Sequence, residues 1–236
     1  MWIKICGIRD LTTALDVAEL APNAIGLNFY HKTPRCVSID TAARIVHHLP
    51  EAVDPVGLFV NHSIDQITAT CQQSGIRTVQ LHGDEPPQLL AQLSSARTGI
   101  RIVHAHRLGL DGLDPLSQYV EECAALKGKL AACLIDARIE GAYGGTGTTV
   151  PWDLLNRQYR RIDWPPLILA GGLNPENVGD AIRIARPWGV DVSSGVESVT
   201  AIKDMRLVKK FINTARCAFE QVTAGDTSSL DSICDL

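Results

Sequence analysis

The sequence predicts an α/β protein that folds as a single (β/α)8 barrel, the TIM-barrel architecture. Eight short, β-branched apolar runs recur about every 20 to 35 residues, and stretches of helical periodicity separate them. Glycine clusters follow the sixth, seventh and eighth runs, and barrels of this type hold phosphate groups after the seventh and eighth strands. An open, doubly wound sheet is the alternative, but its glycine-rich turn would normally follow the first strand, where this chain has only CGIRD.

The expected strands are short, apolar runs that a parallel sheet would bury on both faces. In chain order they are Ile3–Cys6, Ala24–Asn28, Val56–Val60, Thr78–His82, Ile100–His106, Ala131–Asp136, Leu167–Ala170 and Gly189–Ser193.

Helix-start residues stand between most of these runs. Asp, Ser and Thr side chains accept hydrogen bonds from the free amides of a first turn, and proline fits there because it lacks an N–H. Gly75 is placed to end the third helix, and residues 201–219 predict a long amphipathic final helix. The expected start positions are Asp10 or Thr12, Asp40, Ser63, Pro86–Pro87, Pro115 and Pro175.

Composition excludes several classes of protein. The 236 residues are 45% hydrophobic and 20% charged, as in an ordinary globular domain, and the net charge of −4 offers no footprint for nucleic acid or an anionic membrane. No apolar run reaches the ~20 residues of a membrane span. The seven cysteines are scattered and lack a C-x-x-C pair, so we expect neither a disulfide framework nor a zinc site. Together with the lack of a signal peptide, this indicates a cytoplasmic protein.

The last stretch of the chain differs from the rest. Residues 221–236 contain three Asp, no Lys or Arg, and little apolar periodicity. We therefore expect a barrel domain over residues 1–220 and a mobile acidic tail over 221–236.

Two glycine-rich turns suggest a phosphate site. Gly171 and Gly172 follow the seventh strand and precede a helix start, while Ser193, Ser194 and Gly195 end the eighth strand. Glycines allow backbone amides to approach an anion closely, and hydroxyls and a helix start add further donors. Either turn alone could be a simple connection, but two on the last two strands predict a phosphate cradle.

The end of the first strand carries a cysteine that could be reactive. Lys4 and Cys6 share one face of the strand, and Ile3 and Ile5 share the other. The isoleucines should meet the helices, so Lys4 and Cys6 should face the barrel interior, where Lys4 can pair with Asp191 of the neighbouring eighth strand. A free cysteine is usually a buried apolar residue, but a nearby cation would lower its pKa and favour the thiolate.

Four further polar residues stand at strand ends or in the loops after them. Asp136 ends the sixth strand, and no helix signal follows closely enough for it to be a cap. Arg35 lies in the loop after the second strand and could pair with a carboxylate or stack on a ring. His82 ends the fourth strand at the barrel mouth. His104 and His106 share one face of the fifth strand, but they lack matching partners, so we expect no metal there.

Taken together, these segments resemble phosphoribosylanthranilate isomerases, a family of tryptophan biosynthesis. The resemblance spans residues 3 to about 197 and lies in the segments KICGIRD, NFYHKTPRCV, VGLFVN, VQLHGDE, LID followed by YGGTG, LAGGLNPENV and GVDVSSGVE.

The resemblance implies a single barrel without cofactor or metal, acting on a small-molecule sugar phosphate. The reaction implied is the Amadori rearrangement of N-(5-phosphoribosyl)anthranilate to 1-(2-carboxyphenylamino)-1-deoxyribulose 5-phosphate. It implies that Cys6 is the general base, Asp136 the general acid and Arg35 the anthranilate-binding arginine. Departures from the family pattern affect the sixth loop more than the chemistry; they are Asn28, Thr33, Thr148 and Pro151.

Two other functions compete with this assignment. The analogous isomerase of histidine biosynthesis is also a sugar-phosphate barrel, but it would be expected to use two aspartates, and Cys6 argues against it. A barrel that binds phosphate ligands without catalysis is the second alternative, and the presence of both Cys6 and Asp136 argues against that. The sequence leaves monomer and homodimer open.

Overall fold

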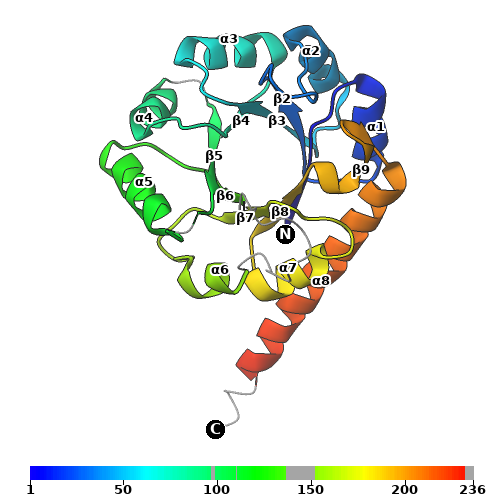
Figure 1. Cartoon of the computed structure of the whole chain (residues 1–236), viewed down its shortest axis with the longest axis vertical. Coiled ribbons are helices and arrows are strands. Elements are labelled where there is room, and N and C mark those ends of the chain that lie inside the picture. The colour runs from blue at the N-terminus through cyan, green and yellow to red at the C-terminus, as the bar shows by residue number, and fades with distance from the viewer. Residues whose placement is uncertain (97–98, 110, 137–151, 232–236) are drawn as a thin grey trace.

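The computed structural model describes residues 1–96, 99–109, 111–136 and 152–231, with side chains as far as 224. It confirms the predicted barrel: eight parallel strands close on themselves in sequence order, and the helices form an outer ring (Figure 1). The strands are β1 Trp2–Cys6, β2 Ala24–Asn28, β3 Asp54–Phe59, β4 Thr78–Leu81, β5 Arg101–Arg107, β6 Ala132–Asp136, β7 Leu167–Ala170 and β8 Gly189–Val192.

A helix follows each strand, as expected, but some helices begin at other residues. Helix α2 is capped by Ser38, whose side chain accepts from the Thr41 amide, rather than by Asp40. Helix α7 begins at Val178, three residues after the expected start at Pro175. The helices are α1 Leu11–Glu19, α2 Ile39–His48, α3 Ile64–Ser74, α4 Pro87–Ser95, α5 Asp114–Ala125, α6 Trp152–Gln158, α7 Val178–Ala185 and α8 Met205–Asp231.

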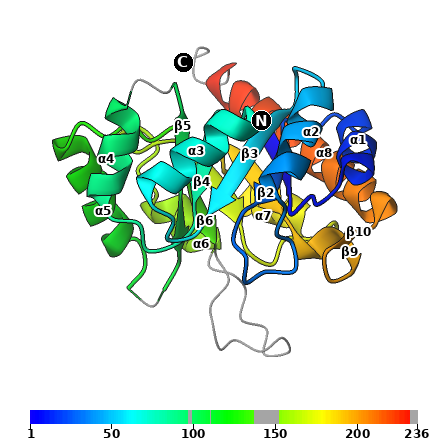
Figure 2. The ribbon, with the colours of Figure 1, turned by 90° about the horizontal axis from the view of Figure 1, so that it is seen from above.

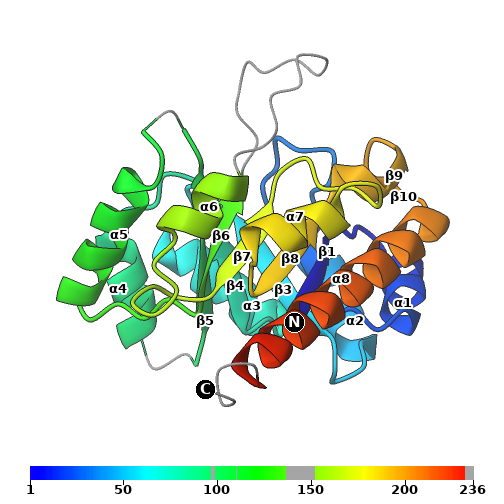
Figure 3. The same cartoon turned by 90° about the horizontal axis from the view of Figure 1, so that it is seen from below.

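A short insertion separates β8 from the last helix. The 3₁₀ helix η1 Ser194–Val196 leads into a two-stranded hairpin, β9 Glu197–Val199 and β10 Ile202–Lys203. The hairpin lies beyond the carboxyl ends of the barrel strands, and α8 runs from there back toward the opposite end (Figures 2 and 3). The insertion therefore lies at the barrel mouth.

Two apolar cores hold the fold together. The larger one lies between the strands and the helices and includes Ile3 and Ile5, as the alternation of β1 predicts. The smaller one fills the barrel with side chains such as Val103, Leu134 and Ile168. Because the interior is packed, any ligand must bind beyond it, at the ends of the strands.

Helix α8 begins four residues later than the helix predicted over 201–219, because Ile202 and Lys203 form the strand β10, and it ends twelve residues later. It continues to Asp231, so residues 221–231 are helical, although they lack clear apolar periodicity. Position 220 is therefore not a boundary of secondary structure, and the mobility of 221–236 remains a prediction. Val222 packs partly buried against the large core, so the start of this segment contacts the barrel.

Deleting residues 221–236 is expected to leave turnover unchanged. Among the described side chains of this segment, Val222 is the apolar one that packs on the core, and its loss should cost about 1 kcal/mol. The melting temperature should fall by about 2–4 °C. Calorimetry of the full chain and the truncated chain measures this change. A fall above ~10 °C would show that the segment is an integral part of the barrel.

Candidate active site

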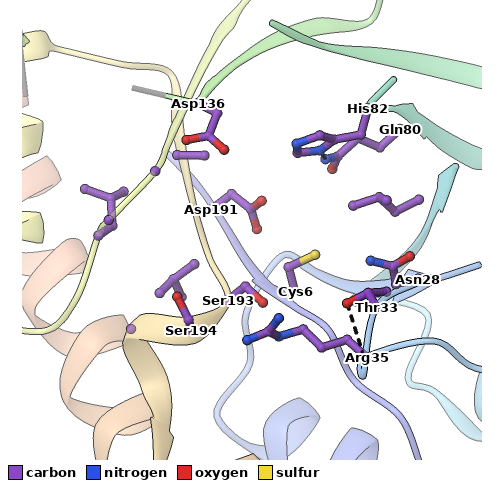
Figure 4. A pocket seen from close by; sticks show the side chains of 17 residues that line it. Cys6, Asn28, Thr33, Arg35, Gln80, His82, Asp136, Asp191, Ser193 and Ser194 are labelled. Carbon is purple, nitrogen blue, oxygen red and sulfur yellow. Dashed lines mark hydrogen bonds between the residues drawn. The ribbon is translucent and has the colours of Figure 1, made fainter. Parts of the chain in front are cut away.

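A cavity of about 200 Å³ opens at the carboxyl ends of the strands. Residues from seven of the eight barrel strands and from the loops after them line it, and side chains such as Cys6, Asp136 and Asp191 point into it (Figure 4). It brings together every residue to which the sequence assigns a catalytic or binding role: Cys6, Arg35, His82, Asp136, Gly171, Gly172, Asp191, Ser193, Ser194 and Gly195.

A buried ion pair forms the floor of this cavity. Lys4 of β1 lies opposite Asp191 of β8 in the parallel register, and their side chains meet at 2.7 Å between Nζ and Oδ1. The predicted pair is therefore confirmed. Burial alone would lower the pKa of Lys4, but Asp191 and the neighbouring Cys6 raise it above its usual value. Lys4 thus remains a cation beneath the thiol.

The thiol of Cys6 is buried, and this changes its expected acidity. Burial raises the pKa of Cys6 above its usual range, and the cations Lys4 and Lys203 offset this effect only in part. We expected a nearby cation to bring this pKa below its usual value, and that expectation is wrong. Cys6 is mainly a thiol at neutral pH, and it becomes a strong base once ionised.

Glycine on the neighbouring strand makes room for the thiol. Gly26 of β2 pairs in register with Cys6. A Cβ at Gly26 would lie 2.6 Å from Sγ of Cys6, closer than real Cβ contacts allow, and 3.0 Å from Cα of Cys6, which is tighter than most. Because the second of these atoms is backbone, the strand pair cannot adjust easily. The absence of a side chain at Gly26 therefore sets the position of the sulfur.

Replacing Gly26 by Ala is expected to lower kcat by about 10²-fold, because the added methyl group must displace the sulfur from the reacting atoms. Gly109→Ala is the matched control, since its Cβ would meet no described atom within 4 Å. Steady-state kinetics of both variants, with circular dichroism to check folding, make the comparison. Equal kcat in the two variants would show that the sulfur position is not critical.

Asp136 and His82 also line the cavity. Asp136 ends β6 and its carboxylate points into the open space, as does the ring of His82 after β4 (Figure 4). Burial lowers the pKa of His82, although the charge of Asp136 opposes this effect, so the ring is neutral at physiological pH. Gln80, which sequence reasoning did not select, lies 2.8 Å from His82 between Nε2 and Nδ1 and fixes the ring.

The two glycine turns lie side by side at one end of the cavity. Gly171 and Gly172 have φ of 85° and 67°, a conformation that favours glycine. A Cβ on Gly195 would overlap the carbonyl oxygen of Leu173, so close packing of the two turns requires glycine there. At Gly172 a Cβ would meet no described atom within 4 Å, which leaves open space in front of the turn.

Arg35 has a partner that sequence reasoning missed. Its guanidinium forms two hydrogen bonds to Glu197, with Nε to Oε1 at 2.8 Å and Nη2 to Oε2 at 2.6 Å. Lys203 of β10 also binds Glu197, 2.9 Å from Oε1. Glu197 ends the segment GVDVSSGVE, but its partner Arg35 is 162 positions away, so one sequence shows no link between them.

The paired histidines of β5 lie outside the cavity. His104 stacks on Tyr119 of α5 with 3.8 Å between ring centroids, so its side faces the helix layer. Burial lowers its pKa to about 3, so the ring is neutral. Among the described residues, no group of three His, Cys, Asp or Glu side chains is arranged to hold a metal ion.

Comparison with known proteins agrees with this geometry. The family model for N-(5'-phosphoribosyl)anthranilate (PRA) isomerase matches residues 3–214. The chain belongs to the PRA isomerase family. A PRA isomerase from Chlorobaculum parvum is 40% identical over 228 residues, which cover 95% of this chain and 99% of that protein. The resemblance seen in the sequence is thus confirmed, and the chain is an isomerase of a family that serves tryptophan biosynthesis.

Solved structures of PRA isomerases share the fold. The Thermotoga maritima isomerase superposes with a TM-score of 0.78 at 36% identity, covering 92% of this chain and 98% of that one. Another PRA isomerase, in complex with reduced 1-(o-carboxyphenylamino)-1-deoxyribulose 5-phosphate, superposes with a TM-score of 0.77 at 34% identity, covering 92% of this chain and 98% of that one.

Among the helices that the structure describes, none has the length and apolar character of a membrane span.

Proposed function

We propose that the protein converts N-(5'-phosphoribosyl)anthranilate to 1-(2-carboxyphenylamino)-1-deoxyribulose 5-phosphate, with Asp136 as general acid and Cys6 as general base. The observation that carries this proposal is that both groups point from different strands into one cavity, which the glycine turns and Arg35 also line (Figure 4). We further infer that the reaction takes place in the cytoplasm and that the protein is a monomer or a homodimer.

The reaction needs two proton transfers at different atoms. Asp136 donates a proton to the ring oxygen of the aminofuranose, and the bond between that oxygen and the anomeric carbon breaks. The nitrogen lone pair forms a C=N bond at that carbon, and the Cys6 thiolate then removes the proton from the adjacent sugar carbon to give an enol. The enol becomes the open-chain ketone as its hydroxyl loses a proton and the former anomeric carbon gains one. The proton lost by Asp136 balances the proton gained by Cys6, as an isomerisation requires. Lys4 beneath the sulfur stabilises the thiolate before transfer.

The cavity holds both ends of the substrate. The amides and hydroxyls of Gly171, Gly172, Ser193, Ser194 and Gly195 bind the phosphate. Arg35 binds the anthranilate ring and its carboxylate. Holding both ends limits the motion of the sugar between the acid and the base, and such positioning lowers the barrier by several kcal/mol.

Arg35→Ala is expected to lower the affinity for both substrate and product by at least about tenfold, which corresponds to about 1.4 kcal/mol of binding free energy. Arg35→Lys keeps the charge but loses the planar fork, so it should restore only part of the affinity. Isothermal titration with the reduced product measures both variants. Wild-type affinity in Arg35→Ala would contradict the assignment of Arg35.

A fluorescence assay tests the proposed activity. The fluorescence of phosphoribosylanthranilate should decay faster in the presence of the protein, in proportion to the amount of protein added. A protein that binds the reduced product but leaves this decay unchanged would be a ligand-binding barrel without catalysis. Decay that persists in a double variant of Asp136→Asn and Cys6→Ser would assign the chemistry to other residues.

A further inference from the structure

We propose that Glu197, held in turn by Lys203, is a positioning residue that fixes the guanidinium of Arg35 for the aromatic end of the substrate. The inference rests on the proposed function, because it assigns Arg35 to the anthranilate group. It gives the β9–β10 hairpin a part in substrate recognition.

The carboxylate of Glu197 is fully satisfied by four donors. Its Oε1 accepts from Arg35 Nε and Lys203 Nζ, and its Oε2 accepts from Arg35 Nη2 and the Ala201 amide at 3.0 Å. The Glu197 side chain is 4% exposed and the Lys203 side chain 1% exposed. A paired, two-point contact of this kind fixes the plane of a guanidinium as well as its distance.

Arg35 is held from a second side by the backbone of Gly7. A Cβ at Gly7 would lie 2.7 Å from Cδ of Arg35, so the stem of the arginine lies directly on this glycine. The pair with Glu197 involves Nε and Nη2, while Nη1 and the flat faces of the guanidinium are outside it. Glu197 therefore orients Arg35 and leaves part of it for a ligand.

Lys203 joins this arrangement to the phosphate end of the cavity. Its ammonium also donates to the carbonyl oxygen of Ser193, at 2.9 Å. Burial alone would raise the pKa of Glu197, but Arg35, Lys203 and the Ala201 amide lower it to about 2, so the carboxylate is ionised at all physiological pH values. The hairpin thus supplies a permanent charge that ties the arginine loop to the loop after β8.

A double-mutant cycle tests the proposal. Wild type, Glu197→Gln, Arg35→Ala and the double variant are titrated with two probes, reduced 1-(o-carboxyphenylamino)-1-deoxyribulose 5-phosphate and ribose 5-phosphate. Glu197→Gln should lower the affinity for the aromatic probe by at least about tenfold and the affinity for ribose 5-phosphate by less than about twofold. In the Arg35→Ala background, Glu197→Gln should lower the affinity for the aromatic probe by less than about twofold.

Controls separate positioning from general stability. Glu121→Gln disturbs an exposed pair with Arg160 and should change neither affinity. Glu197→Asp keeps the buried charge but shortens the side chain, so it should fold even if Glu197→Gln does not, and it should show a smaller loss with the same dependence on Arg35. The proposal would be overturned if changing Glu197 lowered the affinity for both probes equally, or lowered it equally with and without Arg35, or did not lower it at all.

Failure of the proposed function would be visible separately. If wild type does not convert phosphoribosylanthranilate, or if Arg35→Ala alone keeps full affinity for the aromatic probe, the assignment of the reaction or of Arg35 is wrong. If wild type is active and Arg35→Ala weakens the aromatic probe but Glu197 variants do not, only the positioning role of Glu197 is wrong.

Discussion

Replacing Asp136 by Asn should lower kcat by at least about 10²-fold, the lower range for loss of a general acid. Asn keeps the size of the side chain and its place at the end of β6, but it cannot donate the acidic proton to the ring oxygen. Affinity for the reduced product should change much less, because the glycine turns and Arg35 are intact. Steady-state kinetics and titration of the same preparation separate the two effects.

The control for this variant is Asp180→Asn. Asp180 lies exposed on α7 and pairs with Arg183 of the same helix, away from the cavity lining. It should retain wild-type kcat. If Asp136→Asn turns over at the rate of this control, the ring oxygen receives its proton from another group, and His82 at the same mouth would be the next candidate.

Alternation of side chains along a strand is enough to predict much of the site. In β1 it places Lys4 and Cys6 on one face, and closure of the barrel places that face next to Asp191 of β8. The same logic puts all the strand-end residues at one mouth, because parallel strands share their carboxyl end. These residues could therefore be predicted from spacing alone.

Burial and distant pairing cannot be predicted in this way. The sequence shows the cations near Cys6 but not the desolvation that outweighs them. Alternation groups His104 with His106, yet it does not say whether they face the mouth or α5. Glu197 was missed because its role depends on two loops that meet only in the folded chain. Helix α8 runs past the expected end because extending an existing helix costs less than starting one.

Cys6→Ser should also lower kcat by at least about 10²-fold. A serine hydroxyl is far less acidic than a thiol, so the variant supplies almost no anion to remove the proton from carbon. Cys36→Ser is the matched control, because Cys36 lies half-buried in the loop after β2 and is not part of the cavity lining. Wild-type turnover in Cys6→Ser would show that the thiol only packs at the mouth.

The pH dependence of wild type should identify the same group. Because burial raises the pKa of Cys6 despite Lys4 and Lys203, the thiolate is the minor form at neutral pH. The base must be deprotonated while the acid, Asp136, is protonated, so kcat/KM should follow a bell-shaped curve with pH. The residual activity of Cys6→Ser should not follow this curve, because one of the two groups is gone. A wild-type profile that shows neither a rise nor a fall over the pH range in which the protein is folded would mean that ionisation of Cys6 and Asp136 does not control the rate.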